Sequence, residues 1–322
     1  MAALTERFAI RGRSTTGDLA DPARAGGVLG DEVRDTPRKK RVAARLTAPR
    51  DLRAFAAVTG DHNPIPTSVA AARLAGLGAP IVHGMWTSAA AQQQVVSQTG
   101  RRVSGWTTRF MAPVLPGAEV EVRADRVGLD AGAEVLDVTV RADGQVVMSA
   151  SARLDAPRTA HVFPGQGIQS QGMGMAGYQR SKAAREIWDR ADAHTRAALG
   201  FSILTVVRDN PTELTANGVT HRHPDGVLYL TQFTQVAMAV LGAAQMAELR
   251  ESGAFVEGAV LAGHSVGEYN ALAAVSGVIP LEAVVEVVFQ RGSVMHTLVP
   301  RDAQGRSDCR LAAIRPSQIG LA

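Results

Sequence analysis

One stretch of this 322-residue sequence has the spacing of a catalytic serine. Gly263-His-Ser-Val-Gly267 is a Gly-x-Ser-x-Gly run between an apolar strand-like segment, 258–262, and a helix expected from about Glu268. A sharp strand-to-helix turn exposes the serine, and glycines let the neighbouring backbone approach closely. The pattern predicts Ser265 as a nucleophile, with the N–H of Val266 available to an oxyanion.

A second stretch, Val58-Thr-Gly-Asp-His-Asn-Pro-Ile-Pro-Thr-Ser68, is rich in groups that could exchange protons, and it is followed by His83-Gly84. The carboxylate of Asp61 is the candidate acid or base. The same residues would also make an ordinary Asx-type turn that caps the next helix. Pro66 has no proton to give and no N–H, and its ring fixes φ.

Two more residues could complete the serine site. Gln166, in Phe163-Pro-Gly-Gln-Gly167, follows a short predicted strand and could present a hydrogen-bond donor across the site. Arg291 lies about one helix beyond the serine. A guanidinium there could bind a carboxylate through two parallel hydrogen bonds, although a surface helix could also place an arginine at this position.

Together, Gln166, the run His264-Ser-Val-Gly-Glu-Tyr269 and Arg291 resemble the malonyl-CoA:acyl-carrier-protein transacylase family. The resemblance implies that Ser265 carries the acyl group and that Gln166 and the Val266 N–H form the oxyanion hole. It also implies that Arg291 pairs with the malonyl carboxylate.

The general base of that family is a histidine far downstream of the serine, farther than the residues that remain up to Ala322. His264 is adjacent to the nucleophile and is expected to be structural, as are Gly263 and Gly267. His296 is a weaker candidate for the base. Because a serine hydroxyl without a base is a weak nucleophile, we expect no turnover of malonyl transfer by this chain alone.

The frame Gly60-Asp-His-Asn-Pro-Ile65 resembles the MaoC-like family of (R)-specific enoyl hydratases and dehydratases, whose motif continues with histidine where this sequence has Pro66. The resemblance implies that Asp61 acts with that histidine on the water that is added or removed. It implies substrate contacts from Asn63. His83 is expected to bind substrate or to orient the start of the next helix, and the N–H of Gly84 is expected to face the thioester oxygen. The site is therefore either chemically impaired or rescued by another group.

The hydratase-like loop lies in a segment, 41–157, that predicts an α+β hot-dog domain, in which a curved antiparallel sheet wraps a long helix. The expected helix at 81–96 is apolar or small almost all round, which favours burial. Alternating strands then follow; they are expected at 106–110, 118–127, 133–142 and 145–154.

The remaining segments complete the predicted organisation. Residues 1–40 are expected to be an isolated strand at 4–12 and a linker, the end of a preceding hot-dog segment. Residues 158–322 show the strand, glycine-rich turn and helix order of a parallel α/β sheet. They predict an incomplete, hydrolase-like acyltransferase domain that stops just after a strand beginning at 310–314.

Composition narrows the possible functions. Hydrophobic residues make up 46% and charged residues 20%, as in a soluble globular protein, and the net charge is +4. Only 4% of residues are aromatic and no basic face is apparent, which argues against nucleic-acid binding. The single cysteine, Cys309, excludes an internal disulfide and a cysteine-based metal site, and no metal site is predicted. No signal sequence or membrane-spanning run is found, so no membrane partner and a cytoplasmic location are expected.

The order of the two modules resembles the junction of dehydratase and malonyl/palmitoyl transferase in the type I fatty acid synthases of actinobacteria and fungi. The resemblance implies CoA and phosphopantetheine thioesters as substrates, with no cofactor bound by this segment. It also implies acyl carrier protein and the remaining synthase domains as partners, in a homo-oligomer when intact. Two alternatives remain: a non-catalytic scaffold, favoured by Pro66 for the hot dog, and a serine hydrolase, against which Arg291 counts.

Overall fold

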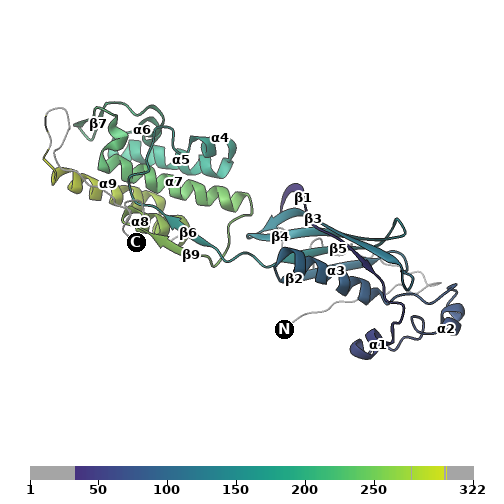
Figure 1. The fold of residues 1–322 in the computed structure, drawn as a ribbon. Helices are drawn as coiled ribbons and strands as arrows, with labels where there is room; N and C mark the ends of the chain where they lie inside the picture. Colours follow the sequence, from purple (N-terminus) through teal and green to yellow (C-terminus); the bar gives the residue numbers. More distant parts are fainter. Residues whose placement is uncertain (1–32, 277, 301, 303–322) are drawn as a thin grey trace, which may run out of the picture. The chain divides into compact units, whose positions relative to one another are not determined.

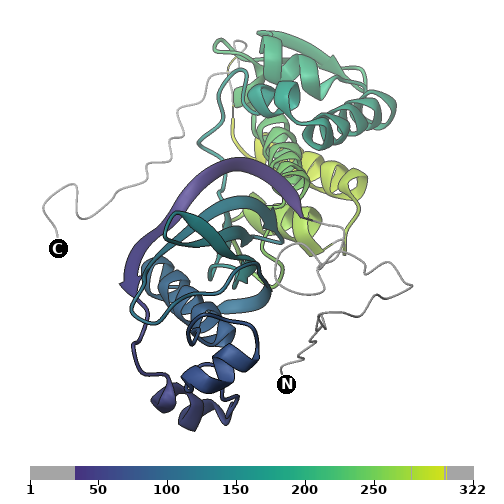
Figure 2. The same cartoon turned by 90° about the vertical axis from the view of Figure 1, so that its right-hand side faces the viewer.

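The structure, a computed structural model, describes residues 33–276, 278–300 and 302. The strands expected at 4–12 and 310–314, as well as Cys309, lie outside these residues. The described chain forms two compact units, the first built from residues 38–127 and 135–154 and the second mainly from the residues after Leu154 (Figures 1 and 2).

The first unit is built on a five-stranded sheet in the order β1-β3-β4-β5-β2. Its strands are β1 (Arg34–Thr47), β2 (Val103–Phe110), β3 (Glu119–Asp130), β4 (Ala133–Ala142) and β5 (Gln145–Leu154). β5 pairs antiparallel with both β4 and β2. Leu136, Val138 and Val140 of β4 are buried at every second position, which confirms the strands predicted from the alternation.

β1 includes residues that were expected to form a linker. It starts at Arg34, so the linker predicted to reach residue 40 is wrong over residues 34–40. The run contains Pro37 and shows little periodicity. β1 is an edge strand of its sheet. An edge strand tolerates proline because the N–H groups on its outer side have no neighbouring strand to bond to.

α3 (Gly84–Thr99) lies along this sheet (Figure 1). Its buried positions are Thr87, Ser88, Ala91 and Val95, at the spacing of one helix face, and the indole N–H of Trp106 in β2 donates to Ser88 Oγ at 2.9 Å. The expected burial all round is wrong, because Val96 and neighbouring residues of the opposite face are exposed. Small residues let α3 pack closely on the sheet, and the described part of this unit covers only that one side.

Two short helices flank the loop that carries the hydratase-like motif. α1 (Arg53–Thr59) ends at Gly60, whose left-handed φ of 72° lets its N–H close the last turn on Ala56 O. α2 (Val69–Leu74) begins after Ser68, whose hydroxyl accepts a hydrogen bond from the N–H of Ala71. The loop is therefore fixed at both ends by helix caps.

In the second unit, β6 (Ala160–Phe163) and β9 (Val260–Gly263) pair in parallel, as the strand, turn and helix order predicts. The helices are α4 (Met175–Arg180), α5 (Lys182–His194), α6 (Ile203–Asp209), α7 (Thr231–Glu251), α8 (Val266–Ala271) and α9 (Leu281–Thr297), with a π-helical turn at Thr195–Leu199, another at Leu272–Ser276 and a 3₁₀ turn at Val227–Tyr229.

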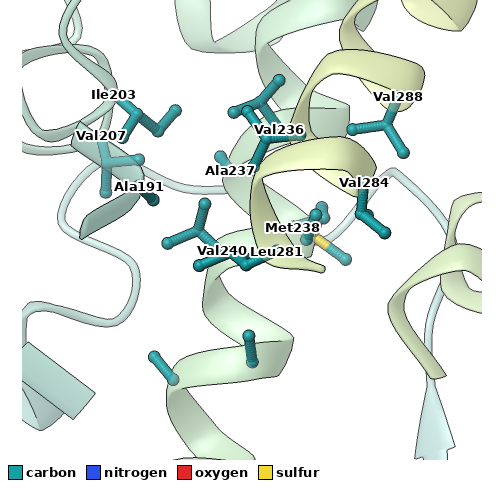
Figure 3. Close-up of a cluster of buried hydrophobic side chains, with 14 of the residues drawn as sticks. Ala191, Ile203, Val207, Val236, Ala237, Met238, Val240, Leu281, Val284 and Val288 are labelled. Atoms are coloured by element: carbon teal, nitrogen blue, oxygen red, sulfur yellow. The ribbon is translucent and has the colours of Figure 1, made fainter. Parts of the chain in front are cut away.

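The core of this unit surrounds α7. Figure 3 shows Val236, Ala237 and Met238 of α7 among side chains of α6 and α9, such as Ile203 and Val284. The helix buries residues on nearly all of its faces. The polar residues Gln232, Thr234 and Gln235 of α7 are therefore held in the interior of the unit.

One element was missed from the sequence. β7 (Glu213–Ala216) and β8 (Val219–Arg222) form a hairpin whose turn residues Asn217 and Gly218 both have positive φ, 47° and 78°. Asn-Gly between alternating residues is the strongest short signal for such a turn, and it was present. In the described part of the chain, no helix is long and apolar enough to cross a membrane.

Candidate active sites

Ser265 sits at the turn between β9 and α8 predicted for a nucleophile. Its φ of 56° and ψ of −113° are rare for a residue with a side chain, and such strain is found where the surrounding structure enforces it. The N–H of Gly267 donates to His264 O at 2.9 Å and that of Glu268 to Ser265 O at 3.1 Å, which closes the turn.

The two flanking glycines are required by close contacts. A Cβ on Gly267 would lie 2.1 Å from the backbone oxygen of Phe163, and one on Gly263 would lie 2.3 Å from the backbone oxygen of Gly267. The turn is thus pressed against the end of β6, the strand that leads into Gln166. This contact places the loop that carries Gln166 beside the serine turn.

Gly267→Ala is expected to lower the free energy of unfolding of the second unit by about 3 kcal/mol, at the upper end for a methyl group forced into a packed interior. The cause is the backbone clash with Phe163, which no rotamer change relieves. Urea unfolding followed by far-UV circular dichroism measures the loss. Gly177→Ala in α4 is the control, because its Cβ would meet only the end of the Glu248 side chain at 3.1 Å. Equal stability of the two variants would contradict the prediction.

Arg291 of α9 reaches the nucleophile directly. Its Nη2 donates to Ser265 Oγ at 2.8 Å, and its Nη1 donates to Gln235 Oε1 at 2.7 Å. The guanidinium carbon also lies 5.7 Å from the centre of the Tyr269 ring, within the range of a cation–π contact. Arg291 is therefore a half-buried cation fixed beside Ser265, and not a free surface side chain.

Gln235 is a site residue that the sequence analysis did not identify. It lies on α7 with no exposed surface, accepts from Arg291, and places its amide nitrogen 3.4 Å from Gln166 Oε1. The same nitrogen lies 3.5 Å from Met295 Sδ. A glutamine within a long apolar helical run was the available signal, since a buried amide needs partners.

These contacts join Gln166, Gln235, Arg291 and Ser265 in one chain of polar side chains from four segments. A carboxylate that approached Arg291 would find two donating nitrogens whose present partners are neutral oxygens. Because a charged acceptor binds such a fork more strongly than a neutral one, the site favours an acidic acyl group next to the serine.

The histidines of this unit lie elsewhere. Among the described residues, the hydrogen bond to Ser265 Oγ comes from Arg291 and none involves a histidine. The His264 ring faces the glycine-rich loop, where a Cβ on Gly165 would lie 2.8 Å from Nδ1. His296 lies beside His221, with 6.4 Å between ring centres, and burial lowers the pKa of His221 below its usual value.

In the first unit, the loop at 60–68 is held by Asx turns. The N–H of Asn63 donates to Asp61 Oδ1 and that of Ile65 donates to Asn63 Oδ1, both at 3.1 Å. The side-chain oxygen of Asn63 is thus engaged with the backbone. Asn63 therefore shapes the loop, and its contact with substrate stays a prediction.

Beside this loop lies a cavity of about 550 Å³, lined mainly by apolar groups that include Ile65, Gly84, Phe110 and Val147. Pro66 is buried next to it. His83 is buried at the start of α3, and its Nε2 lies 3.7 Å from Asp61 Oδ2. Asp61, His83 and Gly84 are brought to one place, and the group at position 66 is a proline ring. The described residues hold no group of three or more His, Cys, Asp or Glu side chains that could bind a metal ion.

Comparison with known families agrees with the two units. The family profile described as "Acyl transferase domain" matches residues 160–321, and that described as "MaoC like domain" matches residues 31–148.

Known proteins share both parts in this order. The chain is 35% identical over 85% of its length to the fatty acid synthase beta subunit stcK of Emericella nidulans, and 36% identical over 82% to the fatty acid synthase subunit beta of Saccharomyces cerevisiae. It spans 16% and 15% of the length of these relatives.

Two solved structures are similar to one part each. The (R)-hydratase from A. caviae is 26% identical and covers 37% of this chain and 97% of its own, with a TM-score of 0.34. The malonyl CoA-acyl carrier protein transacylase from Clostridium perfringens is 28% identical and covers 45% of this chain and 40% of its own, with a TM-score of 0.37. A MaoC-like segment precedes the serine turn, and both parts together are similar to fungal fatty acid synthase β subunits. The chain belongs to the acyl transferase domain family.

Proposed function

We propose that the second unit transfers malonyl and other acyl groups between CoA and acyl carrier protein through an ester on Ser265. The observation that carries the proposal is the hydrogen bond from Arg291 to Ser265 Oγ, which puts a fixed cation beside the nucleophile. Such a cation recognises the free carboxylate of a malonyl group, and it gives no advantage to the neutral esters that a general serine hydrolase would take.

The proposed reaction uses the contacts in order. The malonyl carboxylate binds the guanidinium of Arg291 and displaces its hydrogen bond to Ser265 Oγ. The released Ser265 Oγ then attacks the thioester carbonyl. The N–H of Val266 and the amide of Gln166 stabilise the oxyanion, and the CoA thiolate leaves. The serine proton passes to a general base that no described histidine provides at Ser265, so the expected lack of turnover by this chain alone stays a prediction.

For the first unit, we propose the dehydration of (R)-3-hydroxyacyl thioesters and its reverse, hydration. The apolar cavity beside Asp61 and Gly84 suits an acyl chain, and the orphan N–H groups at the start of α3 suit a thioester oxygen. Both reactions imply CoA or phosphopantetheine thioesters as substrates, acyl carrier protein as partner and assembly with further synthase domains. A homo-oligomer, the absence of a bound cofactor and a cytoplasmic location also stay predictions.

Mass spectrometry of the chain after incubation with malonyl-CoA tests the transferase function. We expect slow formation of one malonyl ester, located on Ser265 by peptide mapping and accelerated by imidazole as a diffusible base. Ser265→Ala should form none. A scaffold would form no ester under either condition. A hydrolase would react faster with a neutral ester such as p-nitrophenyl acetate than with malonyl-CoA.

A further inference from the structure

His83 is a buried imidazole whose ring nitrogens make no hydrogen bond within the described residues. It is 4% exposed, and neither Nδ1 nor Nε2 has a hydrogen-bond partner among the described residues. Buried polar groups are nearly always hydrogen-bonded, so an orphaned one needs an explanation. The backbone oxygen of His83, and not its ring, accepts the hydrogen bond from Trp86 that starts α3.

The ring is held in place by two neighbours. Phe55 of α1 packs on it with 5.2 Å between ring centres, and Asp61 Oδ2 lies 3.7 Å from Nε2. The other oxygen of Asp61 accepts from the N–H of Asn63, which leaves Oδ2 as the one nearest the imidazole. A carboxylate is therefore the acidic group that faces Nε2 of the ring.

The position of His83 along the chain ties it to the cavity. Val82 before it and Gly84 after it both line the cavity of about 550 Å³. The space in front of Gly84 is narrow, because a Cβ there would lie 3.1 Å from the Phe110 ring. A thioester held at Gly84 would therefore lie one residue along the chain from His83.

We propose that His83 is the proton-transferring residue of the hot-dog site in this chain, with Asp61 as its partner. This inference rests on the dehydratase function proposed above. Neutral His83 removes a proton from C2 of a 3-hydroxyacyl thioester, and the C2–H electron pair forms the C2=C3 bond as the C3–O bond breaks. The hydroxyl takes the same proton back from the His83 imidazolium and leaves as water. Hydration is the reverse sequence.

Hydration of crotonyl-CoA by the full chain, followed by loss of the enoyl absorbance, tests the assignment. His83→Asn is expected to lower kcat about 100-fold, the lower limit of what a positioned acid–base group contributes, with KM changed less than threefold. Asp61→Asn is expected to lower kcat as well. His62→Asn is the matched control: His62 is an exposed histidine of the same loop, and its loss should leave the rate within twofold.

Two outcomes overturn the assignment. The first is a kcat of His83→Asn within threefold of the unchanged chain. The second is an inactive unchanged chain whose Pro66→His variant is active, which would leave the dehydratase function in place. If neither is active, the proposed function itself fails. Should circular dichroism show that His83→Asn does not fold, Asp61→Asn decides, because its side chain is half exposed: a loss under threefold overturns the proposal.

Discussion

Pro66→His is expected to raise the rate of crotonyl-thioester hydration by the chain about 100- to 10,000-fold, the contribution of a well-placed general acid–base. The unchanged site works through His83, whose Nε2 lies 3.7 Å from Asp61 Oδ2, too far for a direct hydrogen bond, so its rate is expected to be low but measurable. A histidine at position 66 would stand five residues from Asp61 in the loop frame that resembles the MaoC-like signature.

The loop can accept this change without refolding. Residue 66 is buried, next to Ile65, which lines the cavity, so a new imidazole would enter the interior at the acyl site. The turn is held by the N–H groups of Thr67 and Ser68, which both donate to Pro64 O at 3.1 and 2.8 Å. Neither bond uses residue 66.

The matched variant is Pro66→Ala, which removes the ring without adding a titratable group. It should leave the rate within threefold, and the crotonyl-CoA absorbance assay measures both variants. Equal gains in the alanine and histidine variants would show that the proline ring only blocks the cavity. No gain in either would show that position 66 lies off the reaction path.

Much of the first unit was predictable, because alternation of apolar and polar residues indicates a β-strand with one buried face. β4 and β5 were placed from it residue for residue. Which face of α3 is buried could not be predicted, because small and apolar residues all round a helix permit burial of any face without requiring it. The start of β1 was missed because residues 34–40 show little periodicity, and an edge strand is defined by its pairing with the neighbouring strand.

The two candidate sites differ in what their sequences reveal. Ser265 and Gln166 come from motifs whose glycines are required by contacts within and between the two motifs, so each motif carries a signal in the sequence. Gln235 meets Arg291 only because α7 and α9 pack together, and that meeting leaves no spacing pattern along the chain. His83 drew attention as a residue near a motif, but its unpaired ring nitrogens are a property of the packed structure.

Arg291→Ala is expected to lower the rate of malonyl-ester formation on Ser265, relative to acetyl-ester formation, roughly 30- to 5,000-fold. That range corresponds to 2–5 kcal/mol, the cost of removing one partner of a hydrogen-bonded charge pair. Both Nη atoms of Arg291 point at oxygens in the site, at 2.7 and 2.8 Å, so a carboxylate can engage them as a fork. An acetyl group has no carboxylate that could bind these two nitrogens.

The ratio of the two esters, measured by mass spectrometry with imidazole as diffusible base, separates recognition from damage to the serine turn. A general loss of Ser265 reactivity in Arg291→Ala lowers both rates equally and therefore leaves their ratio unchanged. Arg291→Lys keeps the charge but offers a single ammonium in place of two parallel donors, so its ratio should fall between those of the alanine variant and the unchanged chain. If the alanine variant keeps the original ratio, the hydrogen bond from Arg291 to Ser265 holds the empty turn together and plays no part in selecting malonyl groups.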